Sequence, residues 1–413
     1  MVGSGIAGLT TAHVLGPHHD VTVYEASDRL GGHTNTIDVV DPVAGTIGVD
    51  TGFIVHNDRN YPNLVRLFEE LGVTTQASEM SFSVTDQTVA GRPFTYRATN
   101  LATLMADRRR MVDPRMWRMI VDVLRFYRRS RHHLEHGDPT ITLSEFLAQG
   151  GYGPTFVERH LIPMGAAVWS ADPGTFDRYP ASSLLEFFDH HGLLAFRDRP
   201  EWRTVVGGSR RYVDAIVSRF PGTVHTGTPI RAVRRDEGAV FVRLDRGEQR
   251  FDRVVLACHA DDALGLLSDP SLEEKTVLGA IRFQPNRATL HTDISVLPPT
   301  RRAWAAWNYE RNDVNQRSAR VTYDLTRLQR LRGRNRYLVS LNMEDRIDAS
   351  TVLATFDYAH PVFDREAIEA QRRFDDIDGE MGTHFAGAWW GHGFHEDGVV
   401  SALRVCRRLG VTW

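Results

Sequence analysis

A glycine-rich motif near the start of the chain constrains its fold more than any other feature. Residues 3–8 read Gly-Ser-Gly-Ile-Ala-Gly, which is a GxGxxG pattern. Residues 6–16 then read as a helix with small residues on one face, and residues 21–24 read as a buried strand that ends before Glu25. A glycine-rich turn, a helix, a strand and an acidic residue in this order predict a Rossmann-type α/β fold that binds a dinucleotide.

The backbone of this motif suits a pyrophosphate. The first glycines allow a tight turn and a close approach of the anion, and the helix N-terminus presents free N–H groups to it. The carboxylate of Glu25 can accept hydrogen bonds from ribose hydroxyls. The residues expected at the cofactor in this segment are Gly3, Gly5, Ile6, Ala7, Gly8, Glu25 and Ala26. Only two residues precede the motif, where a strand is usual, so we expect the natural start to lie several residues upstream.

A second glycine-rich turn indicates which dinucleotide is bound. Arg29 and the pair Gly31-Gly32 follow Glu25 directly and give the pattern ExxxRxGG. NAD-dependent dehydrogenases do not usually continue in this way, whereas the arginine and the second turn would extend the anion site along a longer, FAD-like pyrophosphate. The combination resembles the amine-oxidase-like FAD superfamily. That resemblance implies FAD as the cofactor and places Arg29, Gly31, Gly32 and His33 beside it.

The C-terminal segment carries the densest chemistry. Residues 387–398 read GAWWGHGFHEDG and come just before an amphipathic helix that we expect over residues 398–409. A helix N-terminus aimed at the flavin C2 carbonyl would stabilise the negative charge that grows there on reduction. The residues expected at the flavin are Trp390, Gly391, Phe394, Asp397, Gly398 and Val399.

Three further segments complete the predicted FAD-binding domain. Residues 49–55 alternate like a strand and carry Gly52 and Phe53, and a buried strand ends at Ala257. The resemblance to the amine-oxidase-like FAD superfamily implies that a strand around Val233 lies beside the adenine. The chain order predicts interleaved domains. We expect an FAD-binding domain of residues 1–78, 203–275 and 380–413, and an α+β substrate domain of residues 79–202 and 276–379.

The whole chain resembles a bacterial family described only as predicted NAD/FAD-binding proteins. Its members often accompany cyclopropane-fatty-acid-synthase-like methyltransferases. The likeness is carried by residues 387–398, 49–55, 256–261 and 290–293. Some members are linked to introducing a double bond into methyl-branched acyl chains, which implies a fatty-acyl or lipid substrate. Members read YWMNRLQ where residues 323–329 read YDLTRLQ, and this difference is expected to affect the substrate pocket.

The candidate catalytic groups are histidines. Typical amine oxidases of the superfamily carry a lysine near flavin N5, and Lys275, the only lysine here, lies in a stretch that reads as an exposed helix. His291 follows an apolar stretch near the place of that lysine and is the first candidate for a base, although a satisfied core histidine is the more usual interpretation of such a residue. His392 and His395 share the candidacy. No CxxC pair is present, and no metal site is expected.

These features predict an FAD-dependent oxidoreductase. The preferred reaction removes hydride from a hydrophobic C–H donor onto flavin N5 and makes a C=C bond. An amine oxidase, an FAD-dependent double-bond isomerase and a non-catalytic flavoprotein scaffold stay open as alternatives. A lipid substrate predicts a long apolar tunnel, and an amine predicts a short aromatic cage. The sequence does not identify the electron acceptor.

Composition narrows the setting of the protein. A formal net charge of -3 gives no general attraction to nucleic acid, and two cysteines suit a reducing compartment. The start Met-Val-Gly does not read as a signal peptide, so we expect a cytoplasmic protein. Residues 114–134 predict a basic amphipathic helix, which can pack with its arginines in solvent or can lie on the inner face of a membrane.

Overall fold

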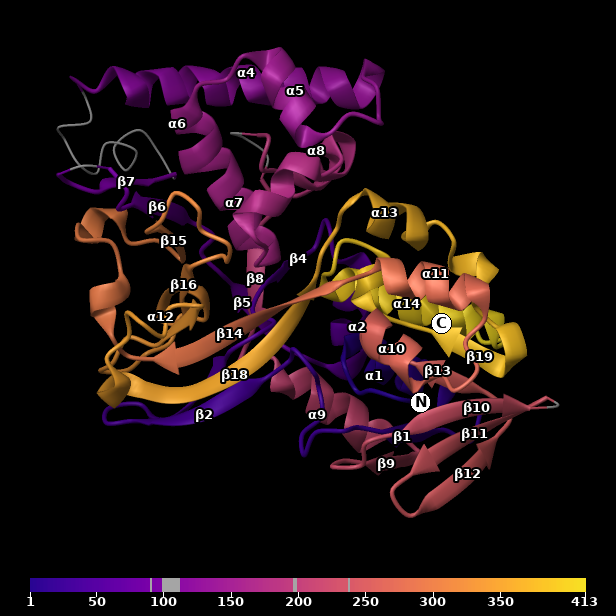
Figure 1. The fold of residues 1–413 in the computed structure, drawn as a ribbon. Coiled ribbons are helices and arrows are strands. Elements are labelled where there is room, and N and C mark those ends of the chain that lie inside the picture. Colours follow the sequence, from indigo (N-terminus) through magenta and orange to yellow (C-terminus); the bar gives the residue numbers. More distant parts are fainter. Residues whose placement is uncertain (90, 99–111, 196–198, 237) are drawn as a thin grey trace.

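The structure is a computed structural model that describes residues 1–89, 91–98, 112–195, 199–236 and 238–413. It contains two regions, a parallel sheet with its covering helices and a larger mixed sheet with a separate layer of helices (Figure 1). The chain passes between the two regions several times, so each region is assembled from segments that are distant in the sequence. This is the mixed α/β architecture that the sequence predicts.

The first region is built on a parallel sheet in which residues 1–3 are central. They lie between β1 (Thr22–Tyr24) and β13 (Val254–Leu256), where Val2 N–H donates to Val255 O at 2.9 Å and Gly3 N–H donates to Tyr24 O at 2.8 Å. β9 (Thr223–His225) extends the sheet beyond β1, and β19 (Thr383–Phe385) extends it beyond β13. The first three residues therefore take the place of the first Rossmann strand and are hydrogen-bonded on both sides.

Helices and a small sheet cover this parallel sheet. α1 (Ile6–Leu15) is buried along almost its whole length and packs against α14 (His395–Arg408). Most of its residues are apolar or small and apolar residues occur all round it, because the helix is enclosed on several sides. The remaining elements of this region are α2 (Pro62–Leu71), α9 (Arg210–Arg219), β10 (Ala232–Asp236), β11 (Ala239–Leu244), β12 (Gly247–Phe251), α10 (Ala260–Leu266), α11 (Leu272–Ala280) and α13 (Arg365–Gln371).

The second region is built on a seven-stranded sheet with the order β18-β14-β17-β16-β15-β6-β7. Most neighbours in this sheet are antiparallel, and β6 and β15 run parallel. The strands are β6 (Phe82–Asp86), β7 (Phe94–Arg97), β14 (Phe283–His291), β15 (Trp307–Arg311), β16 (Val321–Asp324), β17 (Leu338–Leu341) and β18 (Val352–Pro361). In the figure, the long strands β14 and β18 curve from this sheet toward the first region (Figure 1).

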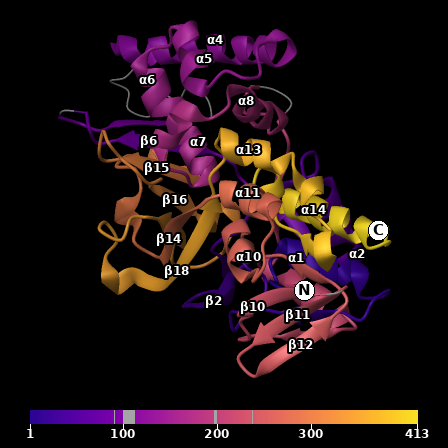
Figure 2. The same ribbon diagram turned by 45° about the vertical axis from the view of Figure 1, so that its right-hand side comes forward.

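A layer of helices covers one end of the large sheet. It consists of α4 (Pro114–His136), α5 (Leu143–Gly150), α6 (Pro154–Phe156), α7 (Ile162–Trp169) and α8 (Ala181–His190), and it forms the top of the molecule (Figure 2). Its side chains share one hydrophobic core with the large sheet. No helix in the described part of the chain is long and apolar enough to cross a membrane.

Shorter elements join the two regions. The hairpin of β2 (Thr36–Asp41) and β3 (Gly45–Asp50) contributes Val39 and Val49 to the core of the second region. β4 (His56–Asn57), β8 (Trp202–Val205) and β5 (Thr75–Ala77) form a small antiparallel sheet. The segment around α12 (Leu325–Leu328) reaches this junction, where Gln329 binds Asp50 through a hydrogen bond of 2.9 Å.

Two boundaries differ from the predictions. β3 ends at Asp50, so residues 51–55 are not a strand, because Phe53 N–H turns to donate to the carbonyl of His33. The last helix begins at residue 395 instead of 398, because Asp397 accepts from Phe394 N–H and caps that turn.

Candidate active site

One large cavity lies where the two regions meet. Its volume is about 1150 Å³, which exceeds the roughly 300–1,000 Å³ of typical small-molecule pockets. The glycine-rich turn at residues 3–7 lines one part of the cavity, and side chains of α7, α8 and the large sheet line another part. The cavity therefore has room for a dinucleotide and for a further ligand beside it.

The glycine-rich turn leaves open space at Gly5. A Cβ built on Gly5 would meet no atom within 4 Å, and the residue has ordinary extended angles, φ -66° and ψ -178°. Gly3 and Gly8 differ, because Cβ atoms there would lie 2.7 Å from Ala257 O and 2.1 Å from Gly3 O. Glycine at position 5 is thus required by neither backbone nor neighbours. The absence of a side chain at Gly5 leaves open space in the cavity at the N-terminus of α1, and such a position suits a phosphate.

Glu25 is held in place beside this turn. Its Oε2 accepts from Ser4 N–H at 2.9 Å and from the Ser4 hydroxyl at 2.6 Å, and its Oε1 accepts from Ser27 N–H at 2.9 Å. The Ser27 hydroxyl also donates to Oε1 at 2.9 Å, so each oxygen accepts two hydrogen bonds, and the side chain lines the cavity. Glu25 is therefore a fixed carboxylate at the position where the ribose hydroxyls of a dinucleotide are expected, and a ribose hydroxyl would replace a serine hydroxyl as its donor.

Arg29 supports the second turn instead of lining the cavity. Its Nη1 donates to the carbonyl of Gly32 at 2.8 Å. Gly31 and Gly32 have positive φ values of 108° and 57°, a conformation that glycine adopts readily. The arginine thus holds the turn whose glycines line the cavity, and its expected part in extending the anion site stays a prediction.

His33 lines this part of the cavity and has an unpaired ring nitrogen. Its Nε2 is buried without a hydrogen-bond partner among the described residues. Its ring stacks on Tyr358 at 4.8 Å, and its carbonyl accepts from Phe53 N–H at 2.9 Å. Gly52 is required beside it, because a Cβ there would lie 2.1 Å from the same carbonyl. Three features of the site fit FAD: the unpaired nitrogen of His33, the open space at Gly5 and the fixed carboxylate of Glu25.

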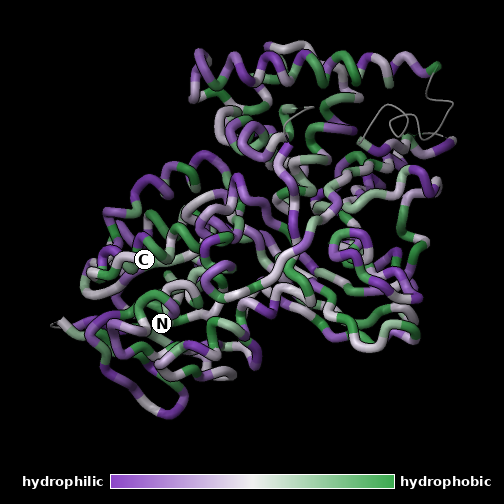
Figure 3. The backbone as a smooth tube through the Cα atoms, turned by 180° about the vertical axis from the view of Figure 1, so that it is seen from behind, coloured by the Kyte–Doolittle hydropathy of each residue, from purple (hydrophilic) through white to green (hydrophobic). Residues whose placement is uncertain are grey.

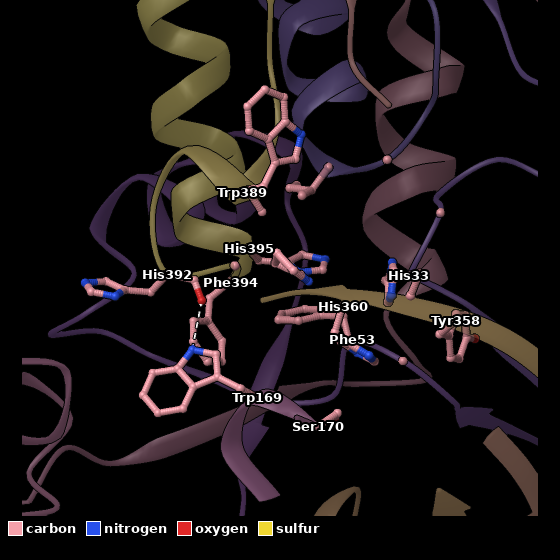
Figure 4. Close-up of a pocket in the computed structure, with 18 of the residues that line it drawn as sticks. His33, Phe53, Trp169, Ser170, Tyr358, His360, Trp389, His392, Phe394 and His395 are labelled. Atoms are coloured by element: carbon pink, nitrogen blue, oxygen red, sulfur yellow. Dashed lines mark hydrogen bonds between the residues drawn. The ribbon is translucent and has the colours of Figure 1, made fainter. Parts of the chain in front are cut away.

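The N-terminus of α14 forms the next wall. Phe394 and His395 line the cavity, and His395 stacks on Phe53 with a ring separation of 3.6 Å. Its Nε2 lies 3.0 Å from the Thr34 hydroxyl and 3.2 Å from the Tyr212 hydroxyl. Figure 4 shows His33, Phe53, His360 and His395 gathered in one area, with the ring of His392 apart from them. Hydrogen bonds and ring stacking therefore hold the His395 side chain in place in this wall.

Several residues predicted at the flavin pack behind this wall and do not line the cavity. A Cβ on Gly398 would lie 2.6 Å from Ile6 Cγ2, so this glycine permits the close contact between α14 and α1. A Cβ on Gly391 would collide with the Asp397 carboxylate at 2.2 Å. Burial raises the pKa of Asp397 to about 7. Trp390 packs on Phe374, and its neighbour Trp389 lines the cavity in its place.

The cavity contains many histidines, and burial keeps them neutral. Desolvation lowers the pKa of His395 to about 3 and that of His360 to about 4. Burial also lowers the pKa of His392, and the pKa of His33 falls well below its ordinary value through burial and the nearby His360 and His259. At neutral pH these rings are uncharged donors and acceptors.

Asn286 fixes one of these rings. Its Nδ2 donates to His360 Nδ1 at 3.0 Å and to Ser170 O at 2.9 Å. Because Nδ1 is the acceptor, the neutral ring carries its proton on Nε2. His360 therefore offers an N–H donor in the cavity, a role that the sequence analysis did not identify.

The part of the cavity formed by the second region is mainly apolar. The rings of Trp169 and Phe187 lie 4.6 Å apart and are tilted by 52°. The Trp169 indole N–H donates to the carbonyl of His392 at 3.1 Å (Figure 4). Tyr323, the one lining residue of the segment 323–329, donates to Ala167 O at 3.3 Å. The other side chains that form this part include Met80, Phe82, Met164, Val168, Leu193, Trp307 and Leu341.

The structure divides the residues predicted at the cofactor into two groups. Those that line the cavity are Gly3, Gly5, Ile6, Ala7, Glu25, Ala26, Gly31, Gly32, His33, Gly52, Phe53, Ala257 and Phe394. Those outside the lining are Gly8, Arg29, Val233, Trp390, Gly391, Asp397, Gly398 and Val399. Val233 is fully buried in the core, and Ile230 lines the cavity three residues earlier.

The candidate base His291 lies outside the cavity. Its Nε2 bonds to the Ser340 hydroxyl at 2.8 Å, its Nδ1 accepts from Asp293 N–H at 3.1 Å, and the residue is fully buried. Both ring nitrogens are therefore used in the core, which corrects the expectation of a catalytic role. Lys275 is exposed on α11 and is also absent from the lining.

Comparisons with known proteins agree with this geometry. The family model for flavin-containing amine oxidoreductases matches residues 6–288. A search of curated proteins finds no significant match. The solved structures with a similar fold include the CLA-producing fatty acid isomerase from P. acnes (TM-score 0.69, 14% identity, 98% of this chain and 97% of that chain). They also include cyclohexylamine oxidase from Brevibacterium oxydans (TM-score 0.69, 18% identity, 99% of this chain and 98% of that chain). A third is putrescine oxidase bound to putrescine (TM-score 0.65, 17% identity, 99% of this chain and 97% of that chain).

At these identities the solved structures show a shared fold, and the family model covers most of the chain. The glycine-rich turn, the Glu25 acceptor and the unpaired His33 nitrogen supply the matching cofactor site. The chain belongs to the flavin-containing amine oxidoreductase family and is an FAD-dependent oxidoreductase.

Proposed function

We propose that the substrate is a hydrophobic molecule of the fatty-acyl or lipid class, and that the reaction is its dehydrogenation to a C=C bond. The observation that carries this proposal is the apolar lining contributed by Met164, Val168, Phe187 and Leu341, continuous with the cofactor part of one cavity. Burying an acyl chain against such side chains is favourable at about 0.8 kcal/mol per CH₂ group.

An amine substrate has less support. The lysine that typical amine oxidases carry near flavin N5 has no counterpart in the described lining, because Lys275 is exposed on α11. A cage for a small amine would consist of aromatic side chains, whereas Met80 and Leu193 add aliphatic surface to this lining. These features favour a long apolar ligand over a small cation.

The reaction requires a hydride acceptor and a proton acceptor. FAD supplies the hydride acceptor when it is bound. We propose His392 for the proton, because its neutral ring lines the cavity and has no hydrogen bond among the described residues. The Trp169 indole holds the carbonyl of the same residue. One C–H bond would lose hydride, the adjacent C–H bond would lose a proton to His392, and the C=C bond would form between the two carbons.

A double-bond isomerase is the second candidate. The fold shared with a fatty acid isomerase shows that this architecture also occurs in a protein named for a fatty acid reaction. Isomerisation would use the same cavity and would return the hydride, so it would consume no electron acceptor. The resemblance to the family that accompanies cyclopropane-fatty-acid-synthase-like methyltransferases makes methyl-branched acyl lipids the first compounds to test.

The test is an anaerobic titration of the FAD-loaded protein. Phospholipids with branched acyl chains, free branched fatty acids and a panel of amines are added separately while the visible flavin spectrum is recorded. Bleaching by a lipid, with an unsaturated product by mass spectrometry, supports the proposal, and bleaching by amines alone contradicts it. A shifted double bond without net bleaching indicates the isomerase.

Variants of two histidines separate chemistry from folding. His392→Asn is expected to bind FAD normally and to lose most of its rate of bleaching. His19→Asn is the matched control, because His19 is exposed and does not line the cavity. An unchanged rate in His392→Asn would remove this residue from the mechanism.

A further inference from the structure

Helix α4 carries an exposed apolar row on the outside of the helical layer. Trp117, Val121 and Leu124 are spaced four and three residues apart, which places them on one helix face. Their exposed fractions are 46%, 50% and 52%. α4 is the outermost element at the top of the molecule, and its hydrophobic and hydrophilic segments alternate along its length (Figures 1 and 3).

Arginines accompany this row. Arg128 continues it by one turn, and Arg118 and Arg125 flank it, with 55% and 42% of their side chains exposed. The helix sequence contains six arginines and two acidic residues, Asp122 and Glu135. Asp122 is fully buried and pairs with both Arg118 and Arg125, so these three residues carry one net positive charge. The exposed Arg128 adds another. This face is basic although the formal net charge of the chain is -3.

The same helix reaches the cavity on its inner side. Tyr127 lines the cavity together with residues of α7 and α8. A surface in contact with the apolar row would thus lie about one helix diameter, roughly 10–12 Å, from the cavity lining.

We propose that this face of α4 docks onto an anionic phospholipid bilayer, with Trp117, Val121 and Leu124 among the headgroups and the arginines on lipid phosphates. Tryptophan favours this interfacial zone, and each arginine near an anionic surface strengthens binding about fivefold. A second copy using the same face is disfavoured, because arginines would oppose arginines. Docking is independent of the substrate that the cavity takes.

The test is co-sedimentation of the full FAD-loaded chain with vesicles, which requires no turnover. Phosphatidylcholine vesicles are compared with vesicles that also contain phosphatidylglycerol, at low and high salt. We expect binding to the anionic vesicles that weakens with salt. The double variant Val121→Glu with Leu124→Glu is expected to bind at least tenfold more weakly, and Arg128→Glu several-fold more weakly at low salt.

Leu272→Glu is the matched control, because Leu272 is an exposed apolar residue on α11, with an exposed fraction of 74%, and should leave binding unchanged. Flavin content and melting temperature report the folding of each variant, and Arg128→Glu provides a second, purely electrostatic measurement. Docking is refuted if the parent ignores anionic vesicles or if the double variant binds like the parent. It is also refuted if the row instead mediates self-association, seen as concentration-dependent dimers without vesicle binding.

Discussion

Alanine substitutions at Gly5 and Gly8, two glycines of the same motif, should have different effects. Gly5→Ala places a methyl group in the cavity, where no protein atom lies within 4 Å of it. Gly8→Ala places a methyl group 2.1 Å from the carbonyl oxygen of Gly3, which is backbone and cannot rotate away. The first variant should therefore lose cofactor affinity, and the second should lose stability.

The magnitudes follow from these contacts. Gly5 has angles that alanine adopts, so the stability of the FAD-free chain should change by less than about 1 kcal/mol. A methyl group that displaces a phosphate from one charge-assisted hydrogen bond costs roughly 1.5–3 kcal/mol, or a tenfold to hundredfold rise in the Kd for FAD. Overpacking at Gly8 costs about 1–3 kcal/mol of the free energy of unfolding.

Two assays measure these effects separately. Denaturant unfolding of the FAD-free proteins gives stability, and flavin fluorescence titration gives the Kd for FAD. The reasoning fails if Gly5→Ala binds FAD with the parent Kd, because the open space would then not be the phosphate site. It also fails if Gly5→Ala is destabilised as strongly as Gly8→Ala.

Three further predictions concern charge, stability and the apolar lining. Burial raises the pKa of Asp50 to about 6 from an ordinary 3.8. Its contribution to stability is therefore full below about pH 4 and is lost as the pH rises through 6. Over that range the free energy of unfolding of the parent should fall by roughly 3 kcal/mol relative to that of Asp50→Asn. Glu274→Ala removes one of the two carboxylates that pair with the buried Arg235 guanidinium, and the other, Asp269, remains at 3.0 Å. The loss should cost about 2 kcal/mol in denaturant unfolding, whereas Asp236→Ala, in an exposed ion pair, should cost less than about 1 kcal/mol. Met164→Trp should keep FAD bound and shift binding toward shorter acyl chains, as measured by ligand titration of the flavin spectrum; equal affinity for all chain lengths would contradict the placement of the chain beside α7.

The cofactor end of the site was predictable because its signals are local. Gly3, Gly5 and Glu25 lie in one strand-turn-helix-strand unit, and their spacing alone brings them together. The glycine pattern did not separate roles within the unit. Gly5 faces the cavity and Gly8 faces Gly3, and only coordinates distinguish open space from close packing.

The substrate end was not predictable in the same way. Its lining comes from α7, α8 and strands of the large sheet, which meet through long-range packing. Tyr358 and His360 are two residues apart on β18, so their shared face follows from strand periodicity. No local pattern says that this face meets His33, with a ring separation of 4.8 Å for Tyr358 and 5.3 Å for His360.

The error at His291 has the same physical origin. The sequence analysis placed a base near the flavin at His291, which is the last residue of β14. The residue of β14 that lines the cavity is Phe283, at the other end of the strand, and Asn286 contributes indirectly by holding the ring of His360. His291 lies where the pairing of β14 with β18 shifts its register, and its ring meets Ser340 in the core. The local pattern around His291 does not say which end of the strand reaches the cavity, because that depends on how the large sheet packs against the first region.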